Sequence, residues 1–224
     1  MWDDVDRLLN RWFPIARVEE AVPRHVVQAQ LLGQEIAIWR DDAGHVNAWE
    51  NRCPHRGVRL SIGINDGTEL RCIYHGWRYA SGTGQCTFIP AHPHQKPANV
   101  IKTKPYGVAE RYGFVWANLG EGADISALPA LGLNAWTTLR SIFITAPPAA
   151  VAESLIAAGA DSTDGLIFTD PDKTVLLLQP VTEGQTVVHG LVGQEVPGPE
   201  RLPLLRYHNA RLGDLRDALE KAAA

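Results

Sequence analysis

The sequence lacks the features that mark several large classes of protein. It has no apolar run near the ~18 residues that a membrane-spanning helix needs, and its acidic start lacks the basic-then-apolar order of a secretory signal. Three cysteines in 224 residues are too few for a disulfide framework. Lysine and arginine form no block, and 25 acidic against 21 basic residues give a net charge of -4, so neither nucleic acid nor an anionic membrane is expected as a partner. We expect a cytoplasmic protein whose cysteines stay reduced.

The sequence does have enough apolar residues for a core, 45% of the chain, and many of them lie in short β-prone runs. Residues 3–12 predict a short N-terminal helix that ends at Pro14. From there to residue 119, strand-forming runs alternate with turns rich in Gly and Asp, which favours an antiparallel sandwich or a small barrel. The runs are 26–32, 35–40, 46–50, 69–71, 77–80, 87–89, 102–110 and 114–118.

A second region begins near residue 120 and mixes helices with strands. Residues 120–124 have the composition of a linker, so we divide the chain into domains 1–119 and 120–224. The second domain is expected to contain a strand at 138–145, a helix at 149–158, a hairpin of 174–179 with 185–192, and a helix at 211–221 with leucines on one face.

Two cysteines and two histidines form a concentrated set of metal-binding side chains. Cys53 and His55 lie in one short segment, and Cys72 and His75 lie in another, in the pattern C-x-H-x16-C-x2-H. Zinc fingers usually group Cys with Cys and His with His. Here each segment supplies one of each, which suits two metals side by side, one held by both thiolates and the other by both imidazoles, as in a Rieske [2Fe–2S] cluster. A chance arrangement and a zinc site are the alternatives.

The two segments also carry a family resemblance. CPHRGVRLSIG and RCIYHGWRY resemble the Rieske domain of bacterial Rieske non-haem iron oxygenases, over about residues 10–120. The resemblance implies a Rieske-type [2Fe–2S] cluster, with Cys53 and Cys72 on one iron and His55 and His75 on the solvent-facing iron. Respiratory Rieske proteins carry an extra Cys in each loop, which this chain lacks. The resemblance therefore implies fewer hydrogen bonds to the sulfurs, and a potential low in the range of about -150 to +300 mV.

The remaining cysteine and histidines have weaker claims to a chemical role. Cys86 is expected to be a small buried hydrophobe rather than a ligand. We interpret His92 and His94 as structural or docking residues beside the cluster. His189 lies in the middle of an expected strand and is interpreted as structural.

The family's oxygenases also contain a mononuclear iron, held by two His and a carboxylate in the helix pattern E-N-x-x-D-x-x-H-x4-H. The best match begins at Glu153, but Ala157, Ala160 and Gly165 occupy the places of the Asp and both His, and none of them has an iron-binding side chain. We therefore predict a mainly β protein: a Rieske antiparallel β-sandwich domain, then a shortened α+β remnant of the oxygenase catalytic domain. No catalytic residue is predicted in this chain.

These features favour an electron-transfer subunit of a multicomponent Rieske-type oxygenase. It would take electrons from a reductase or ferredoxin and pass them to the mononuclear iron of a catalytic oxygenase subunit in a hetero-oligomer. One alternative is an autonomous oxygenase with atypical iron ligands such as His92, His94, His189 or Asp161. Another is a non-catalytic paralogue that uses the cluster for structure or redox sensing.

Overall fold

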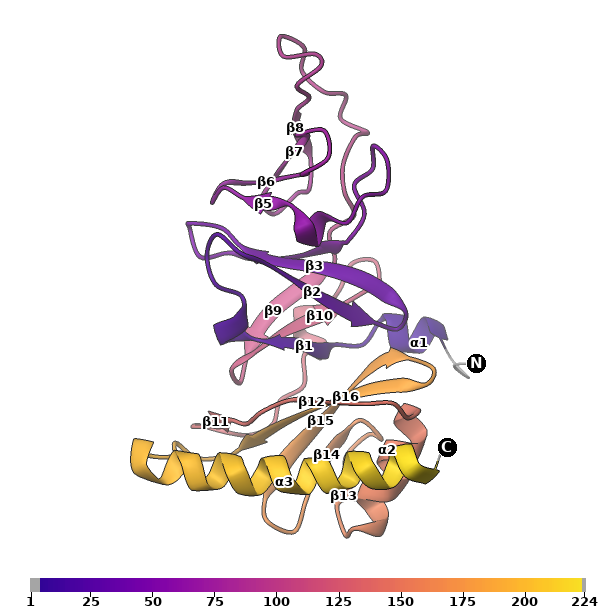
Figure 1. The fold of residues 1–224 in the computed structure, drawn as a ribbon, viewed down its shortest axis with the longest axis vertical. Coiled ribbons are helices and arrows are strands. Elements are labelled where there is room, and N and C mark those ends of the chain that lie inside the picture. Colours follow the sequence, from indigo (N-terminus) through magenta and orange to yellow (C-terminus); the bar gives the residue numbers. More distant parts are fainter. Residues whose placement is uncertain (1–4, 223–224) are drawn as a thin grey trace. The chain divides into compact units, whose positions relative to one another are not determined.

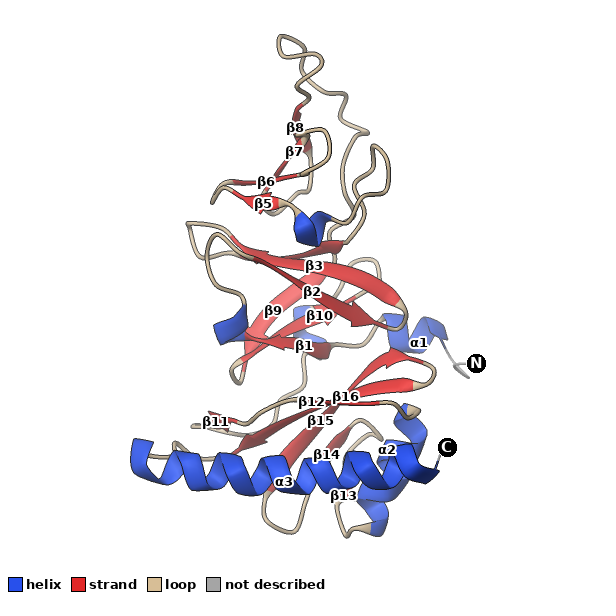
Figure 2. Cartoon of the chain, viewed as in Figure 1, coloured by secondary structure: helices blue, strands red, loops and turns tan. Residues whose placement is uncertain are grey.

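The computed structural model describes residues 5–222, which divide into two compact units (Figure 1). One unit contains residues 5–30 and 34–127, and the other contains residues 31–33 and 128–222. Strands dominate the first unit, whereas the second combines one sheet with two helices (Figure 2). The predicted mainly β fold class is therefore confirmed.

The first unit consists of three small sheets. They have the strand orders β1-β10-β9, β2-β3-β4 and β5-β6-β7-β8. All neighbouring strands of the first and third sheets are antiparallel, and so are β3 and β4. The strands are β1 (Phe13–Arg17), β2 (Val26–Leu31), β3 (Gln34–Arg40), β4 (Val46–Glu50), β5 (Ile64–Asn65), β6 (Glu69–Arg71), β7 (Arg78–Ala80), β8 (Cys86–Phe88), β9 (Gly107–Arg111) and β10 (Phe114–Asn118). Short helical segments are α1 (Val5–Leu9), η1 (Val18–Glu20), η2 (Leu60–Ile62) and η3 (Ile125–Ala127).

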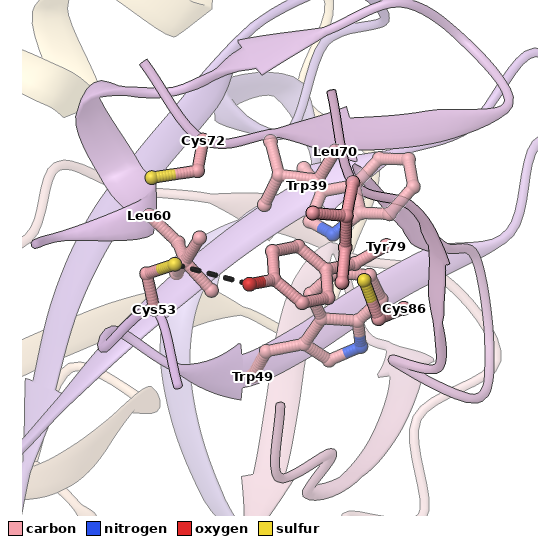
Figure 3. Close-up of a cluster of buried hydrophobic side chains, with 10 residues drawn as sticks. Trp39, Trp49, Cys53, Leu60, Leu70, Cys72, Tyr79 and Cys86 are labelled. Atoms are coloured by element: carbon pink, nitrogen blue, oxygen red, sulfur yellow. Dashed lines mark hydrogen bonds between the residues drawn. The ribbon is translucent and has the colours of Figure 1, made fainter. Parts of the chain in front are cut away.

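An aromatic cluster forms part of the core of this unit (Figure 3). Trp39 on β3 and Trp49 on β4 meet edge to face, with ring centroids 5.0 Å apart, and both are completely buried. All three cysteines belong to the same cluster. The loops that carry Cys53 and Cys72 are thus anchored in the hydrophobic core at their cysteines, because those side chains lie inside it.

The second unit is a six-stranded sheet with two helices. The strand order is β11-β16-β15-β14-β13, and β12 also pairs with β16. The elements are β11 (Thr137–Thr138), β12 (Ile142–Ile144), α2 (Pro148–Ala157), β13 (Asp161–Ser162), β14 (Ile167–Thr169), β15 (Thr174–Thr182), β16 (Gln185–Val192) and α3 (Gly198–Ala222).

The core of the second unit lies between its sheet and its helices. Alternate residues of the central hairpin, such as Leu176, Leu178 and Val188, pack together with Val151 of α2 and Leu212 of α3. This arrangement follows from the period of two in a strand, which places every second side chain on the same face of the sheet.

Several elements differ from the sequence-based expectation. The run 102–110 forms a strand only from Gly107, and the strand expected at 138–145 is divided into β11 and β12. Pro14 does not simply end a helix; it lies in β1, an edge strand with a register irregularity between Pro14 and Ala16, where a residue without an N–H is tolerated. The C-terminal helix begins at Gly198 rather than at residue 211, and Pro203 lies within it. His208, one turn before the predicted start, is already buried, so packing extends the helix beyond the leucine pattern.

Among residues 5–222, no helix is both long and apolar enough to cross a membrane.

The leucines of α3 provide a test of how the second unit is stabilised. Leu212 is 4% exposed in the core, whereas Leu202 on the same helix is 54% exposed. We expect Leu212→Ala to lower the free energy of unfolding by about 2–5 kcal/mol, because it removes buried methyl groups and leaves a cavity. Leu202→Ala should change it by less than about 0.5 kcal/mol. Urea unfolding followed by circular dichroism measures both, and equal losses would contradict the assigned burial.

Candidate metal centre

Two loops of the first unit share one backbone design. In residues 53–58, the N–H of Cys53 donates to the carbonyl of Val58 (2.8 Å), and the N–H of Gly57 donates to the carbonyl of Cys53 (2.8 Å). In residues 72–77, the N–H of Cys72 donates to Trp77 (2.8 Å), and the N–H of Gly76 donates back to Cys72 (3.0 Å). Each loop is therefore closed by the same two hydrogen bonds, one between residues five apart in the chain and one between residues four apart.

A glycine is required at the same place in each loop. Gly57 has φ +70° and Gly76 has φ +71°, a left-handed conformation that side chains with a Cβ adopt only with strain. An added Cβ at Gly57 would meet nothing within 4 Å, whereas one at Gly76 would lie 3.1 Å from Cγ of Pro90. The segment after β8 thus packs against the second loop.

The two loops bring a pair of thiols together in the core. Cys53 is 4% exposed and Cys72 is 2% exposed. Burial raises the pKa of Cys72, and the hydrogen-bonding contact with the Cys53 thiol raises it further, while the backbone N–H groups of Tyr74 and His75 oppose this by donating to its sulfur. The pair is therefore sheltered from water, and backbone donors are already placed to stabilise negative charge on Cys72.

Tyr79 on β7 adds a donor to the other sulfur. Its Oη lies 3.0 Å from Sγ of Cys53, the contact drawn as a dashed line in Figure 3. Burial raises the pKa of Tyr79, so the phenol keeps its proton. A metal-bound thiolate has no proton to give, so Tyr79 would be the donor to it.

The loops also place two imidazoles side by side. The ring centroids of His55 and His75 are 4.7 Å apart. The His55 ring stacks on Trp77, with ring centroids 4.3 Å apart and an angle of 8° between the ring planes. The ring centroids of Tyr74 and His75 are 3.8 Å apart. His55 is half-buried and His75 is exposed. Burial lowers the pKa of His55, and the nearby charges of His75 and Arg56 lower it further, which favours the neutral, ligating form.

The four side chains form two pairs of different chemistry, two buried thiols and two outer imidazoles. Such a donor set fits a two-iron cluster with thiolates on one iron and imidazoles on the other. Within residues 5–222, no group of three or more His, Cys, Asp and Glu side chains is placed to hold a single metal ion.

The other residues considered from the sequence lie elsewhere. Cys86 is buried in the aromatic core, with Sγ 3.7 Å from the carbonyl of Phe88. His92 and His94 are exposed in the segment after β8. His189 is buried, with its ring nitrogens 2.7 Å from Ser141 and 2.7 Å from Gln179. Asp161 is exposed on β13.

The three residues that stand at the ligand positions of the mononuclear iron motif lie in different local structures. Ala157 is the last residue of α2, Ala160 is 7% exposed in the core, and Gly165 has φ +78° just before β14. They therefore lie at the end of a helix, in the core and in a bend before a strand.

Sequence reasoning missed Tyr79, Trp77 and Pro90 as parts of the centre. The signal for Tyr79 was an aromatic residue in the middle of a short strand, next to the charged Arg78, which indicates that the two side chains face opposite sides. Which sulfur it reaches, and that Pro90 meets Gly76, depend on contacts between segments distant in sequence.

Comparison with known proteins gives a family match and several relatives. Residues 11–105 match the model of the Rieske [2Fe-2S] domain. Over 142 residues the chain is 56% identical to oxidoreductase NdmD of Pseudomonas putida, covering 62% of this chain and 24% of that protein. It is 37% identical over 106 residues to the 3-chlorobenzoate-3,4-dioxygenase oxygenase subunit of Comamonas testosteroni, covering 47% of this chain and 24% of that subunit. The chain thus matches about a quarter of the length of each relative.

A solved structure of apo dicamba monooxygenase has a similar fold. The TM-score is 0.79 at 20% identity, and the alignment covers 96% of this chain and 86% of that one. At this identity the similarity shows a shared fold, which extends through the second unit.

The loop glycines provide a stability test. We expect Gly57→Ala to lower the free energy of unfolding by about 1–2 kcal/mol, because alanine adopts the left-handed backbone conformation only with strain. Gly76→Ala should cost more, because its Cβ would also press on Pro90. Gly184→Ala is the control, since its backbone is not left-handed and nothing lies within 4 Å of the added Cβ. Chemical denaturation measures all three, and an unchanged Gly76→Ala variant would contradict the loop geometry.

Proposed function

We propose that Cys53 and Cys72 hold one iron of a Rieske [2Fe–2S] cluster and that His55 and His75 hold the other, because residues 11–105 match the model of that domain. We further propose that the chain is an electron-transfer subunit of a multicomponent Rieske-type oxygenase. Its electrons would come from a reductase or ferredoxin and pass to the mononuclear iron of a partner chain.

The observation that carries this proposal is the pairing within the two loops. The same two backbone hydrogen bonds orient Cys53 and Cys72, and the following histidines come within 4.7 Å of each other between ring centroids. A cluster with two different iron environments needs two thiolates on one side and two imidazoles on the other. The two loops bring both pairs together, as such a cluster requires.

When bound, a Rieske cluster accepts and donates one electron at a time. The residues of this chain set the conditions for that exchange. Burial of the two cysteines excludes water from the sulfurs, while the exposed His75 leaves one edge of the centre accessible. The hydroxyl of Tyr79 and the N–H groups of Tyr74 and His75 favour the more negative, reduced state.

The second unit supports a role for a partner in the later chemistry. A facial triad needs two imidazoles and a carboxylate, but the corresponding places are held by Ala157, Ala160 and Gly165. Relatives include an oxygenase subunit of a dioxygenase and a protein named oxidoreductase. An electron carrier that works with a separate catalytic chain fits these observations.

A second candidate is an autonomous oxygenase. It is favoured by the fold similarity to a monooxygenase across 96% of the chain, since the architecture of the second unit is retained. In that case the iron would need ligands outside the usual helix pattern, such as His92, His94, His189 or Asp161.

Substitution of one cysteine should distinguish ligands from core residues. We expect Cys72→Ser to lose the Rieske absorption and EPR signals together with the labile sulfide. Cys86→Ser is the matched control, because Cys86 is equally buried but is not proposed as a ligand, and it should keep two irons per chain. Iron and sulfide analysis of both variants measures this. One zinc and no sulfide in the wild-type protein would refute the cluster.

Removal of the Tyr79 hydroxyl should lower the reduction potential. Tyr79→Phe keeps the ring in the core but removes the donor to Cys53, so the reduced state loses stabilisation. Tyr106→Phe makes the same change at another buried tyrosine, 8% exposed, and should leave the potential unchanged. Redox titration followed by absorbance compares the two. A potential that rises in Tyr79→Phe would contradict the hydrogen bond as a stabiliser of the reduced state.

The function itself is tested by reconstitution. The purified chain is mixed with a flavin reductase, NADH, excess ferrous iron and a panel of aromatic and N-methyl substrates. We expect the cluster to be reduced, two irons per chain, and no oxygenated product until a catalytic oxygenase subunit is added. A third iron with product coupled to NADH use by the chain alone would establish the autonomous oxygenase instead.

A further inference from the structure

A groove lies between the edge strand β12 and the C-terminal helix of the second unit. Its volume is about 540 Å³, and residues 140–143 line one side. The other side consists of residues of α3 that recur every three or four positions and so share one side of the helix: Asn209, Gly213, Arg216, Asp217 and Glu220. From Arg140 to Thr145 the extended chain spans about 17 Å, and from Asn209 to Glu220 the helix spans a similar length. The groove is thus long enough for about five extended residues.

The outer edge of β12 carries main-chain groups that no other strand uses. The carbonyl of Ala146 accepts from the hydroxyl of Thr186 on β16 (2.9 Å), whereas the N–H of Thr145 donates to Glu220 on α3 (2.8 Å). Because the main-chain groups of successive strand residues point to opposite sides, those of Phe143 point into the groove, as that of Thr145 does. Within residues 5–222, Phe143 has no hydrogen bond on that side. Its N–H and carbonyl are therefore available to a strand placed beside β12.

Gly213 keeps the helix side of the groove open. It lies in the interior of the 25-residue helix α3, where glycine is less favourable than alanine. A Cβ at this position would meet nothing within 4 Å, so no contact among the described residues requires a glycine. A chain segment that passes close to the helix backbone would require it, because any side chain would take up part of the space.

The two ends of the groove carry opposite charge. Glu220 lies at the end near Thr145, and the exposed Arg140 lies at the other end. Between them, Arg216 and Asp217 compensate each other at 3.3 Å. Among residues 5–222, no carboxylate forms a salt bridge with Arg140. A strand antiparallel to β12, the more stable arrangement, would run from Glu220 towards Arg140. Charge complementarity therefore favours a segment with a basic residue first and an acidic residue last.

We propose that this groove binds an extended segment of a partner protein, which adds to the sheet as a strand antiparallel to β12. The segment would place a basic residue beside Glu220, an apolar residue beside Phe143 and a carboxylate beside Arg140. Phe143 is 46% exposed and offers the apolar contact. Main-chain hydrogen bonds would supply affinity, and the side chains would supply specificity and direction. The site goes beyond the proposed function, because it lies in the second unit and contains none of the proposed cluster ligands.

A designed peptide tests this binding mode on the intact protein. The probe is a fluorescein-labelled hexapeptide with blocked ends and the order Lys-Thr-Val-Thr-Val-Asp, and fluorescence polarisation follows its binding. We expect saturable binding. The peptide of reversed order has the same composition and charge, and it should bind at least about tenfold more weakly. Hydrogen-exchange mass spectrometry should show slower amide exchange in the segment that contains Phe143 when the hexapeptide is bound.

Substitutions in the groove locate the site. Gly213→Leu should weaken binding at least about tenfold by filling the groove, without lowering the midpoint of thermal unfolding, since leucine favours a helix more than glycine does. Ala218→Leu is the matched control, because Ala218 is exposed on the same helix but does not line the groove, and it should change the affinity less than about twofold. Arg140→Glu should weaken binding of the original peptide and restore it for a peptide that ends in Lys instead of Asp.

Three results would overturn the peptide site: no saturable binding, equal binding of the reversed peptide, or binding that Gly213→Leu leaves unchanged. Self-association of the chain that Gly213→Leu weakens and Ala218→Leu does not would also overturn it, because the edge would then pair with a second copy of this chain. Iron and sulfide analysis of the same samples separates these results from a failure of the proposed cluster, since neither β12 nor α3 contains a proposed ligand.

Discussion

The proposed cluster imposes one constraint on the first unit: two chain segments must present one thiol and one imidazole each, in matching orientation. Each loop meets it with a cysteine whose N–H and carbonyl are both used to close the loop. Closure in turn requires the left-handed glycines, Gly57 and Gly76. The buried tryptophans of β3 and β4 belong to the same hydrophobic cluster as both cysteines (Figure 3). Packing therefore supplies the rigidity that short loops alone would lack.

The same arrangement places the two halves of the centre in different electrostatic environments. The thiol side lies in the core, where donors such as Tyr79 and the backbone N–H groups stabilise negative charge. The imidazole side lies near the surface, where Tyr74 and His75 are exposed and Arg56 follows His55 in the chain. Hydrogen bonding to the sulfurs and access to the imidazoles thus depend on different residues of one short region, because one set is buried and the other is not.

The second unit folds without the side chains of the iron motif, since Ala157, Ala160 and Gly165 stand at the compared positions. Its stability comes from apolar packing between the central hairpin and the helices, to which Ala160 also contributes. Such packing needs apolar side chains of suitable size and does not depend on iron ligands. The fold similarity to a monooxygenase across both units is compatible with this difference in chemistry.

The sequence alone determined the features that depend on near neighbours. Spacing placed the proposed ligands in two loops, and alternation with turn residues located most strands and the hairpin of β15 and β16. Tertiary structure decided the rest. It placed Tyr79 against Cys53, Pro90 against Gly76 and a strand at Pro14, and it extended α3 back to Gly198. The physical reason is that local pattern constrains torsion angles and faces, whereas burial and edge position arise only when distant segments pack together.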